Sequence, residues 1–254
     1  MRYRVDLSFH GAGFHGWQRQ LHDRTVQGEL ESWLTRLLAA TEQIAVTGAG
    51  RTDAGVHASA MVAHFDTELS FDPVHLTLRL QAAIPPDLVV HRVSPAPQGF
   101  HARYSAVARG YEYHITNRPS PFDRDRVWYV PGRLSMADLK AAATLVLGRH
   151  DFSGFCIAAS RKEQNTCDLT HSSWECVGET IVYRARADRF LHMMVRLLVG
   201  TMVDIGRGRW SPGRMEEILT SRDVKLCGAA APPHGLTLVA VEYPTDPDGA
   251  GDFG

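Results

Sequence analysis

Several features that define common protein classes are scarce or absent in this chain. The four cysteines show no C-x-x-C spacing, so neither a zinc site nor a disulfide framework is expected. No apolar run reaches the length of a membrane span, and the N-terminal residues alternate like a strand and lack a signal-peptide core. We therefore expect a protein of the reducing cytoplasm with no membrane contact and no bound metal.

Lysine is also scarce. Only Lys140, Lys162 and Lys225 occur among the 27 basic residues, so arginine supplies most of the positive charge. Arginine makes bidentate contacts with phosphate and stacks on bases, which favours an RNA partner. The net charge of −1 at pH 7 argues the other way, although the acidic segment at residues 244–254 accounts for part of it. A genomic preference for arginine codons gives the same composition, so composition alone leaves both interpretations open.

The glycine-rich stretch at residues 48–57, GAGRTDAGVH, lacks the features of a phosphate-binding loop. A dinucleotide-binding motif has a third glycine three residues after the second, but counting from Gly50 that position is Asp53. A Walker loop has Gly-Lys-Ser/Thr, which is absent here. A carboxylate at this point repels a pyrophosphate, so another role is expected for the loop.

Asp53 is the central feature of that stretch. Residues 43–46 and 59–65 are typical of strands, which places Asp53 in a turn between two strands. Functional side chains are often presented by such a turn on a rigid scaffold. The alternative is an aspartate that only caps its own turn through the backbone. The loop by itself does not decide between these interpretations.

Hydrophobic periodicity divides the chain into two α+β halves, residues 1–104 and 105–243, followed by a tail at 244–254 that we expect to be disordered. The first half has the order β-α-β-β-α-β. Its expected elements are strands at 2–9 and 88–93, helices at 26–38 and 73–82, and two strands around Asp53. The expected elements of the second half are strands at 107–115, 172–177, 180–187 and 236–242 and helices at 136–147, 189–205 and 213–220.

Residues 50–58, GRTDAGVHA, resemble the active-site signature of the tRNA pseudouridine synthase A family. Other segments of the chain match the family in the same order, so the resemblance is full-length. These segments are GWQRQ at 16–20, TVQGELE at 25–31, FHAR at 100–103, GRHDF at 148–152, FLHMMVR at 190–196 and GLTLVAV at 235–241. The resemblance implies two ferredoxin-like or RRM-like halves that join into one extended, mainly antiparallel sheet. It also implies helices on one face of that sheet and a central catalytic cleft.

The resemblance implies an isomerase that converts uridine to pseudouridine at positions 38, 39 and 40 of the tRNA anticodon stem-loop. It implies a homodimer in which one tRNA contacts both subunits. The reaction breaks the N1–C1′ bond, rejoins uracil through C5 and releases the C5 proton, so no metal or organic cofactor is expected.

Arg196 needs an anionic partner on physical grounds. Arg189, His192 and Arg196 are spaced to form one stripe on an otherwise apolar helix, and a buried cation is costly unless it is paired. The resemblance implies that Asp53 is the partner of Arg196. The alternative partners are Glu175, Asp188 and Asp204.

An arginine beside Asp53 would keep its carboxylate ionised. Asp53 is then expected to act on the ribose, either as a nucleophile at C1′ or as a base at C2′. By resemblance, Tyr111 stacks on the uracil and assists removal of the C5 proton. Because a phenol is a poor base unless its surroundings lower its pKa, the stacking role is favoured. A core position on the sheet is the alternative for Tyr111.

The target base must leave its stack to reach such a site. Arg51 is expected to hold the phosphate of the flipped nucleotide, and His57 to support the loop. The other residues expected to contact RNA are Trp17, Gln18, Arg19, His101, Arg103, Arg109 and Arg189. The chain departs from the family pattern at His10, where aspartate is usual, and at Gln81, where asparagine is usual.

Two other functions remain to be weighed. A non-catalytic RNA-binding protein with paired RRM-like sheets would carry an aromatic-rich RNP strand, which is not found here. A nucleosidase or other hydrolase of glycosidic bonds commonly pairs two carboxylates, and no second acidic motif accompanies Asp53.

Overall fold

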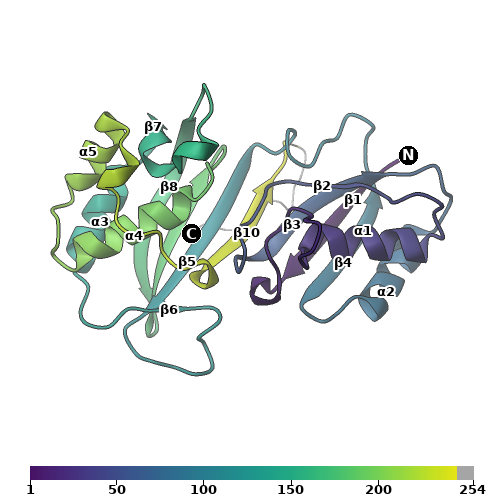
Figure 1. Cartoon of the computed structure of the whole chain (residues 1–254), viewed down its shortest axis with the longest axis horizontal. Helices are drawn as coiled ribbons and strands as arrows, with labels where there is room; N and C mark the ends of the chain where they lie inside the picture. The colour runs from purple at the N-terminus through teal and green to yellow at the C-terminus, as the bar shows by residue number, and fades with distance from the viewer. Residues whose placement is uncertain (245–254) are drawn as a thin grey trace. The chain divides into compact units, whose positions relative to one another are not determined.

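The computed structural model describes residues 1–244, which form five α-helices and ten β-strands that pair mainly antiparallel (Figure 1). This confirms the predicted α+β class. None of the helices in these residues is long and apolar enough to span a membrane. The described residues divide into two compact units, one formed by residues 1–107 and 238–244, the other by residues 108–237.

This division differs from the predicted boundaries, because residues 105–107 and 238–243 group with the first unit. Hydrogen bonds explain the difference. The backbone N–H of Val107 donates to the carbonyl of Glu242 at 2.8 Å, and the Tyr243 hydroxyl donates to the carbonyl of Ala102 at 2.6 Å. The strand β10 (Leu236–Glu242) thus returns the chain to the first unit. The predicted tail, apart from Pro244, lies outside the described residues.

The first unit has the predicted order β-α-β-β-α-β. In it β1 pairs with β3 and β4, and β2 also pairs with β3, all antiparallel. Its elements are β1 (Arg2–Phe9), α1 (Val26–Leu37), β2 (Val46–Gly48), β3 (His57–Asp66), α2 (Pro73–Ala83) and β4 (Leu88–Pro95).

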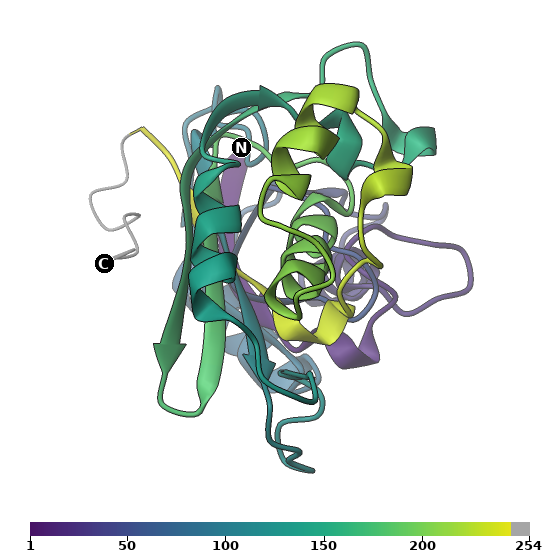
Figure 2. The same cartoon turned by 90° about the vertical axis from the view of Figure 1, so that its left-hand side faces the viewer.

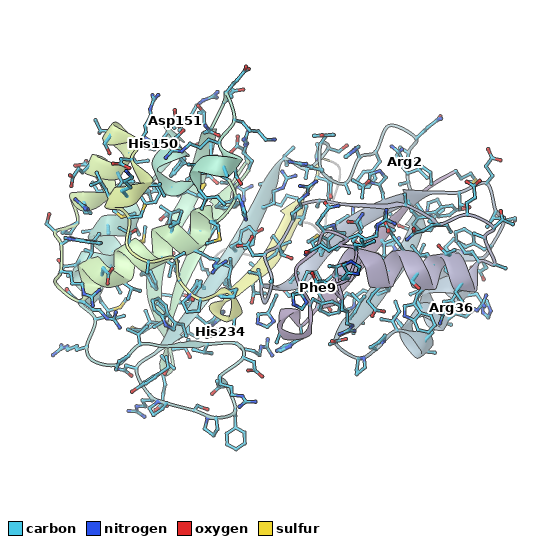
Figure 3. The ribbon with its side chains drawn as sticks, viewed as in Figure 1. Arg2, Phe9, Arg36, His150, Asp151 and His234 are labelled. Atoms are coloured by element: carbon cyan, nitrogen blue, oxygen red, sulfur yellow. The ribbon has the colours of Figure 1, made fainter. Side chains whose placement is uncertain are left out.

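Alternation along β1 places one row of side chains in the core of the first unit, as the period-2 pattern predicts. Tyr3, Val5, Leu7 and Phe9 are all buried (Phe9 is labelled in Figure 3). Helix α1 begins after Thr25, whose side chain accepts a hydrogen bond from the Gly28 N–H and so caps the N-terminus of the helix.

The second unit contains β5 paired with β9, β9 with β8, and β8 with β7, all antiparallel, and a short parallel pairing of β6 with β5. Helix α3 packs against β8 and α4, and α3 and α4 lie on the same side of the strands (Figure 2). The elements are β5 (Ala108–Thr116), β6 (Trp128–Tyr129), α3 (Met136–Thr144), β7 (Gly148–Asp151), β8 (Thr166–Val177), β9 (Thr180–Ala187), α4 (Met194–Gly206) and α5 (Arg214–Ser221).

The predicted helix at 189–205 begins later than expected. Met193 has φ of 67° in the left-handed region, and α4 starts only at Met194. Arg189 and His192 therefore precede the helix, and the predicted stripe of three basic residues does not form. Every residue of α4 except Arg196 is buried, which agrees with the apolar character expected for this helix.

Candidate active site

Asp53 lies in the loop of residues 49–56 that joins β2 to β3. The backbone N–H of Val56 donates to the Asp53 carbonyl at 3.1 Å and closes a four-residue turn. Gly55 occupies the third position of this turn with φ of 80°, a value that glycine adopts without strain. The half-buried Asp53 side chain therefore projects from the first position of a tight turn.

Residues 11–17 pack against this loop and fix its backbone. A β-carbon on Gly11 would collide with the carbonyl of Val56. Gly16 has φ of 89°, and its β-carbon would lie 2.7 Å from the carbonyl oxygen of Thr52. That same oxygen accepts a hydrogen bond from the Trp17 N–H at 3.1 Å. Glycine at 11 and 16 thus allows two backbone segments to touch, which leaves little freedom at Asp53.

His57 supports the loop, in line with its predicted role. Its ring is buried, and Nδ1 accepts a hydrogen bond from the Gly11 N–H at 2.9 Å. His10, one of the departures from the family pattern, has its ring 4.5 Å from that of His57. The other departure, Gln81, donates from Nε2 to the carbonyl of Val90 and so joins α2 to β4.

The predicted RNA-contacting residues at 17–19 differ in exposure. Trp17 is only 2% exposed, so its indole supports the loop from inside the first unit. Gln18 is exposed, and the Arg19 side chain is 52% exposed, with its Nη1 3.1 Å from Glu31 Oε2. Arg51, in the loop itself, is exposed.

His101 and Arg103 lie together with an exposed aromatic residue for which the sequence predicted no RNA contact. The Nδ1 atom of His101 accepts hydrogen bonds from the N–H groups of Arg103 and Tyr104. The guanidinium carbon of Arg103 lies 5.7 Å from the centre of the exposed Tyr104 ring. An arginine next to an exposed aromatic side chain is a surface on which a base can stack. The adjacency was visible in the sequence, in which Tyr104 directly follows the matched segment 100–103.

In the second unit the tyrosines of β5 have different environments. Tyr113 is fully buried, its hydroxyl donates to the Pro232 carbonyl at 2.7 Å, and burial raises its pKa. Tyr111 is half-buried, and its ring meets Phe190 edge to face at 5.1 Å. No role was predicted for Phe190 from the sequence. Arg109 donates from Nη1 to the carbonyl of Asp188 at 2.9 Å.

Arg196 is fixed against the chain that leads to β10. Its Nε donates to the Ala231 carbonyl at 2.8 Å, and its own carbonyl accepts from the Ala231 N–H at 2.9 Å. Its Nη1 lies 3.1 Å from the sulfur of Met193. These contacts set the direction of the guanidinium group.

The three alternative partners of Arg196 have other contacts. The Glu175 carboxylate pairs with Arg184, and Asp204 pairs with Arg209 at 2.7 Å. Asp188 Oδ1 accepts hydrogen bonds from the backbone N–H groups of Asp168 and Arg189. Arg189 also donates from Nη2 to the carbonyl of Gln164 at 3.3 Å.

A sequence model described as "tRNA pseudouridine synthase" matches residues 8–105 and 142–244 of this chain. The chain belongs to the tRNA pseudouridine synthase family. Asp53 and Arg196 lie within the matched residues, whereas Tyr111 lies between the two matched stretches. The match therefore does not extend to Tyr111, whose role stays a prediction.

Curated relatives agree over nearly the full length. A tRNA pseudouridine synthase A of Cereibacter sphaeroides (strain ATCC 17025) is 43% identical, over 97% of this chain and 98% of the relative. Those of Bacillus subtilis (strain 168) and Parabacteroides distasonis are each 37% identical over 96% of this chain, covering 99% and 97% of the relatives. A chain of a solved structure titled "Crystal Structure of a Cbf5-Nop10-Gar1 Complex" aligns at a TM-score of 0.35 and 11% identity, which is too low to support a conclusion.

This tRNA pseudouridine synthase is an isomerase that converts uridine in tRNA to pseudouridine. The predicted family and reaction are confirmed. The family assignment favours isomerisation over the two alternatives, simple RNA binding and hydrolysis of a glycosidic bond.

Proposed function

We propose that Asp53 is the catalytic carboxylate of this synthase. The observation that supports this most strongly is its turn, which the backbone contacts of Gly11 and Gly16 hold in one conformation. A catalytic group must be held close to the geometry in which it reacts. A preorganised turn holds it there before the substrate binds, so no further conformational entropy is lost during the reaction.

The carboxylate acts on the ribose of the target uridine, either at C1′ or at the C2′ proton. In both routes the N1–C1′ bond breaks, a C1′–C5 bond forms, and the proton lost from C5 is balanced by one gained at N1. The net reaction is an isomerisation and uses no co-reactant.

Arg196 pairs with Asp53 in this proposal, as the family resemblance implies. Its guanidinium is directed by the Ala231 carbonyl, and the alternative carboxylates are engaged with other residues. A neighbouring cation favours the ionised carboxylate that the chemistry requires.

Tyr111 stacks on the uracil in the proposed site. Its ring is half-buried and is held at its edge by Phe190, which suits a face that receives a planar base. Tyr113, two residues along, is ruled out for this role by its full burial.

The flipped nucleotide and its flanks are held by basic and polar residues. Arg51 takes the phosphate next to the target base, since it is exposed two residues before Asp53. Trp17 is left out because it is buried. The further residues that we propose to contact tRNA are Gln18, Arg19, His101, Arg103, Arg109 and Arg189.

We infer from the family resemblance that the targets are uridines 38, 39 and 40 of the anticodon stem-loop, and that the enzyme acts in the cytoplasm as a homodimer. A dimer doubles the surface that arginine residues offer to one tRNA, which offsets the near-neutral net charge of −1.

The experiment is to replace Asp53 with alanine, to map pseudouridine in tRNA after incubation, and to measure tRNA binding separately. We expect isomerisation to disappear at all three positions while the dissociation constant changes by less than about threefold, because Asp53 is not a phosphate-binding group. Full turnover by the variant would overturn the assignment. Release of free uracil by the wild-type protein would favour the hydrolase alternative.

A further inference from the structure

Glu31 is a buried carboxylate that the proposed mechanism does not use. It lies on α1, on the same face as Leu30 and Leu34, and its side chain is only 2% exposed. A carboxylate in such a place is costly unless several hydrogen bonds and a cation compensate for it. Its contacts therefore indicate what it is for.

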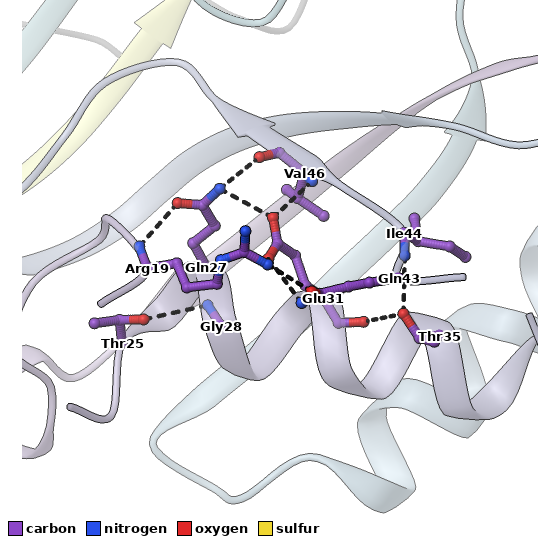
Figure 4. A network of polar contacts seen from close by, with 9 residues as sticks. All are labelled: Arg19, Thr25, Gln27, Gly28, Glu31, Thr35, Gln43, Ile44 and Val46. Carbon is purple, nitrogen blue, oxygen red and sulfur yellow. Dashed lines mark hydrogen bonds and ion pairs between the residues drawn. The ribbon is translucent and has the colours of Figure 1, made fainter. Parts of the chain in front are cut away.

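Four donors surround the two oxygens of Glu31 (Figure 4). Oε1 accepts hydrogen bonds from the Val46 N–H and from Gln27 Nε2, each at 3.0 Å. Oε2 accepts from Arg19 Nη1 at 3.1 Å and from Gln43 Nε2 at 3.2 Å. One carboxylate thus joins the segment that follows Trp17, helix α1 and the start of β2.

Two of these segments lead directly to the loop that carries Asp53. Val46 is the first residue of β2, which ends at Gly48, immediately before the loop. On the other side, Arg19 follows Trp17, whose backbone N–H donates to the carbonyl of Thr52.

Gln27 strengthens the same link. Its Oε1 accepts from the Arg19 N–H at 2.9 Å, and its Nε2 donates to the Val46 carbonyl at 3.0 Å. Glu31 and Gln27, one turn apart on α1, therefore fix both chain segments that support the loop.

We propose that Glu31 is a positioning residue with two separable effects, an inference that rests on the proposed role of Asp53. Through Val46 it fixes β2 and hence the Asp53 loop. Together with Gln43, whose Oε1 accepts from Arg19 Nη1 at 2.6 Å, it holds the half-exposed guanidinium group of Arg19 in the orientation that contacts tRNA.

A glutamine at position 31 separates the two effects. An amide has one acceptor oxygen, so it cannot satisfy both Val46 N–H and Arg19 Nη1, and neither of those donors can become an acceptor. The Val46 N–H is buried, whereas Arg19 can turn to water. The oxygen therefore stays with Val46, and the Arg19 contact is lost.

The experiment measures the tRNA dissociation constant and the single-turnover rate for Glu31→Gln, Arg19→Gln, the double variant and Glu31→Leu. Glu31→Gln and Arg19→Gln should each weaken tRNA binding about tenfold with a rate within about threefold of wild type, and the double variant should be no weaker than either. Glu31→Leu frees β2 as well, so its rate should fall about 100-fold at saturating tRNA.

Thr77→Val is the matched control. Thr77 is also buried in the first unit, donates to the Pro73 carbonyl and accepts from the Val93 N–H, but it joins α2 to β4. The Thr77→Val substitution should lower the melting temperature and leave both the single-turnover rate and the tRNA affinity unchanged.

The inference would be overturned if the losses of tRNA affinity were additive in the double variant, or if folded Glu31→Gln bound tRNA as tightly as wild type. Both results can be obtained even if Glu31→Leu fails to fold. Asp53→Ala, measured in parallel, tests the catalytic assignment alone. If that variant keeps its turnover, the proposed function fails, while the coupling between Glu31 and Arg19 is still decided by the affinities.

Discussion

The indole of Trp17 covers Gly48 so closely that a β-carbon on Gly48 would lie 2.5 Å from two carbons of the ring. Because Trp17 is buried and its backbone holds the Thr52 carbonyl, the ring has little room to move away. Gly48→Ala should therefore lower the free energy of unfolding by about 1–3 kcal/mol, as overpacking does in other cores. Urea unfolding followed by tryptophan fluorescence measures this change.

Gly50→Ala is the control for that prediction, since a β-carbon on Gly50 meets nothing within 4 Å. Equal stability loss at both positions would show that contact with Trp17 does not determine the effect.

The contact between Tyr111 and Phe190 gives a second prediction. An edge-to-face aromatic pair contributes about 0.5–1.5 kcal/mol beyond burial, so Phe190→Ala releases the Tyr111 ring. We expect the single-turnover rate of this variant to fall about five- to tenfold. The rate of Phe190→Tyr, which retains the ring, should stay within about twofold of wild type. A wild-type rate for Phe190→Ala would mean that Tyr111 needs no such support.

Much of this fold follows from local pattern, and the exceptions have physical causes. The bounds of β1, β9 and β10 follow from alternation, and the Thr25 N-cap follows from its residue type. The start of α4 does not follow from the sequence pattern. The apolar spacing continues through Met193, but the backbone of Met193 is in the left-handed region, so the helix begins only after it.

The candidate site shows the same contrast. The motif suggested the role that we propose for Asp53, but nothing in the sequence suggested the burial of Trp17 or the contacts of Glu31. Trp17 in a matched segment suggested an RNA contact, and only its burial shows that it supports the loop. Glu31 falls on the apolar face of a helix, and three of its four donors come from other segments that the sequence could not place beside that helix.

His64 predicts a dependence of stability on pH. Its buried Nδ1 accepts a hydrogen bond from the Ala102 N–H, and burial, followed by the positive charge of Arg2, lowers its pKa from 6.5 to about 4. Between these two values the unfolded chain binds a proton that the folded chain does not. The contribution to stability is therefore complete above pH 6.5 and is lost as the pH falls towards 4.

An NMR titration of the His64 ring should give this low pKa. The free energy of unfolding should be smaller at pH 4.5 than at pH 7. His64→Asn keeps an acceptor for Ala102 but does not titrate, so its stability should change less between the two pH values. A ring that titrates near 6.5 would contradict the prediction.

Thr52, next to Asp53, has a buried hydroxyl for which the described residues offer no hydrogen-bond partner. Thr52→Val should therefore leave the free energy of unfolding unchanged or raise it by up to about 1 kcal/mol, because no hydrogen bond is lost. Thr77→Val removes a hydroxyl with two partners and should cost about 1–3 kcal/mol. Thermal unfolding of the two variants compares them directly, and a greater loss at Thr52 would mean that its hydroxyl is satisfied in solution.

The most direct test of the account is release of tritium from tRNA labelled at uracil C5, with Asp53→Asn compared with wild type under single-turnover conditions. Asparagine preserves the shape of the side chain and removes its charge. We predict that the variant binds the labelled tRNA within about threefold of wild type and releases tritium at least about 1,000-fold more slowly, since it lacks the group that acts on the ribose. Tritium release by Asp53→Asn at the wild-type rate would contradict the central claim.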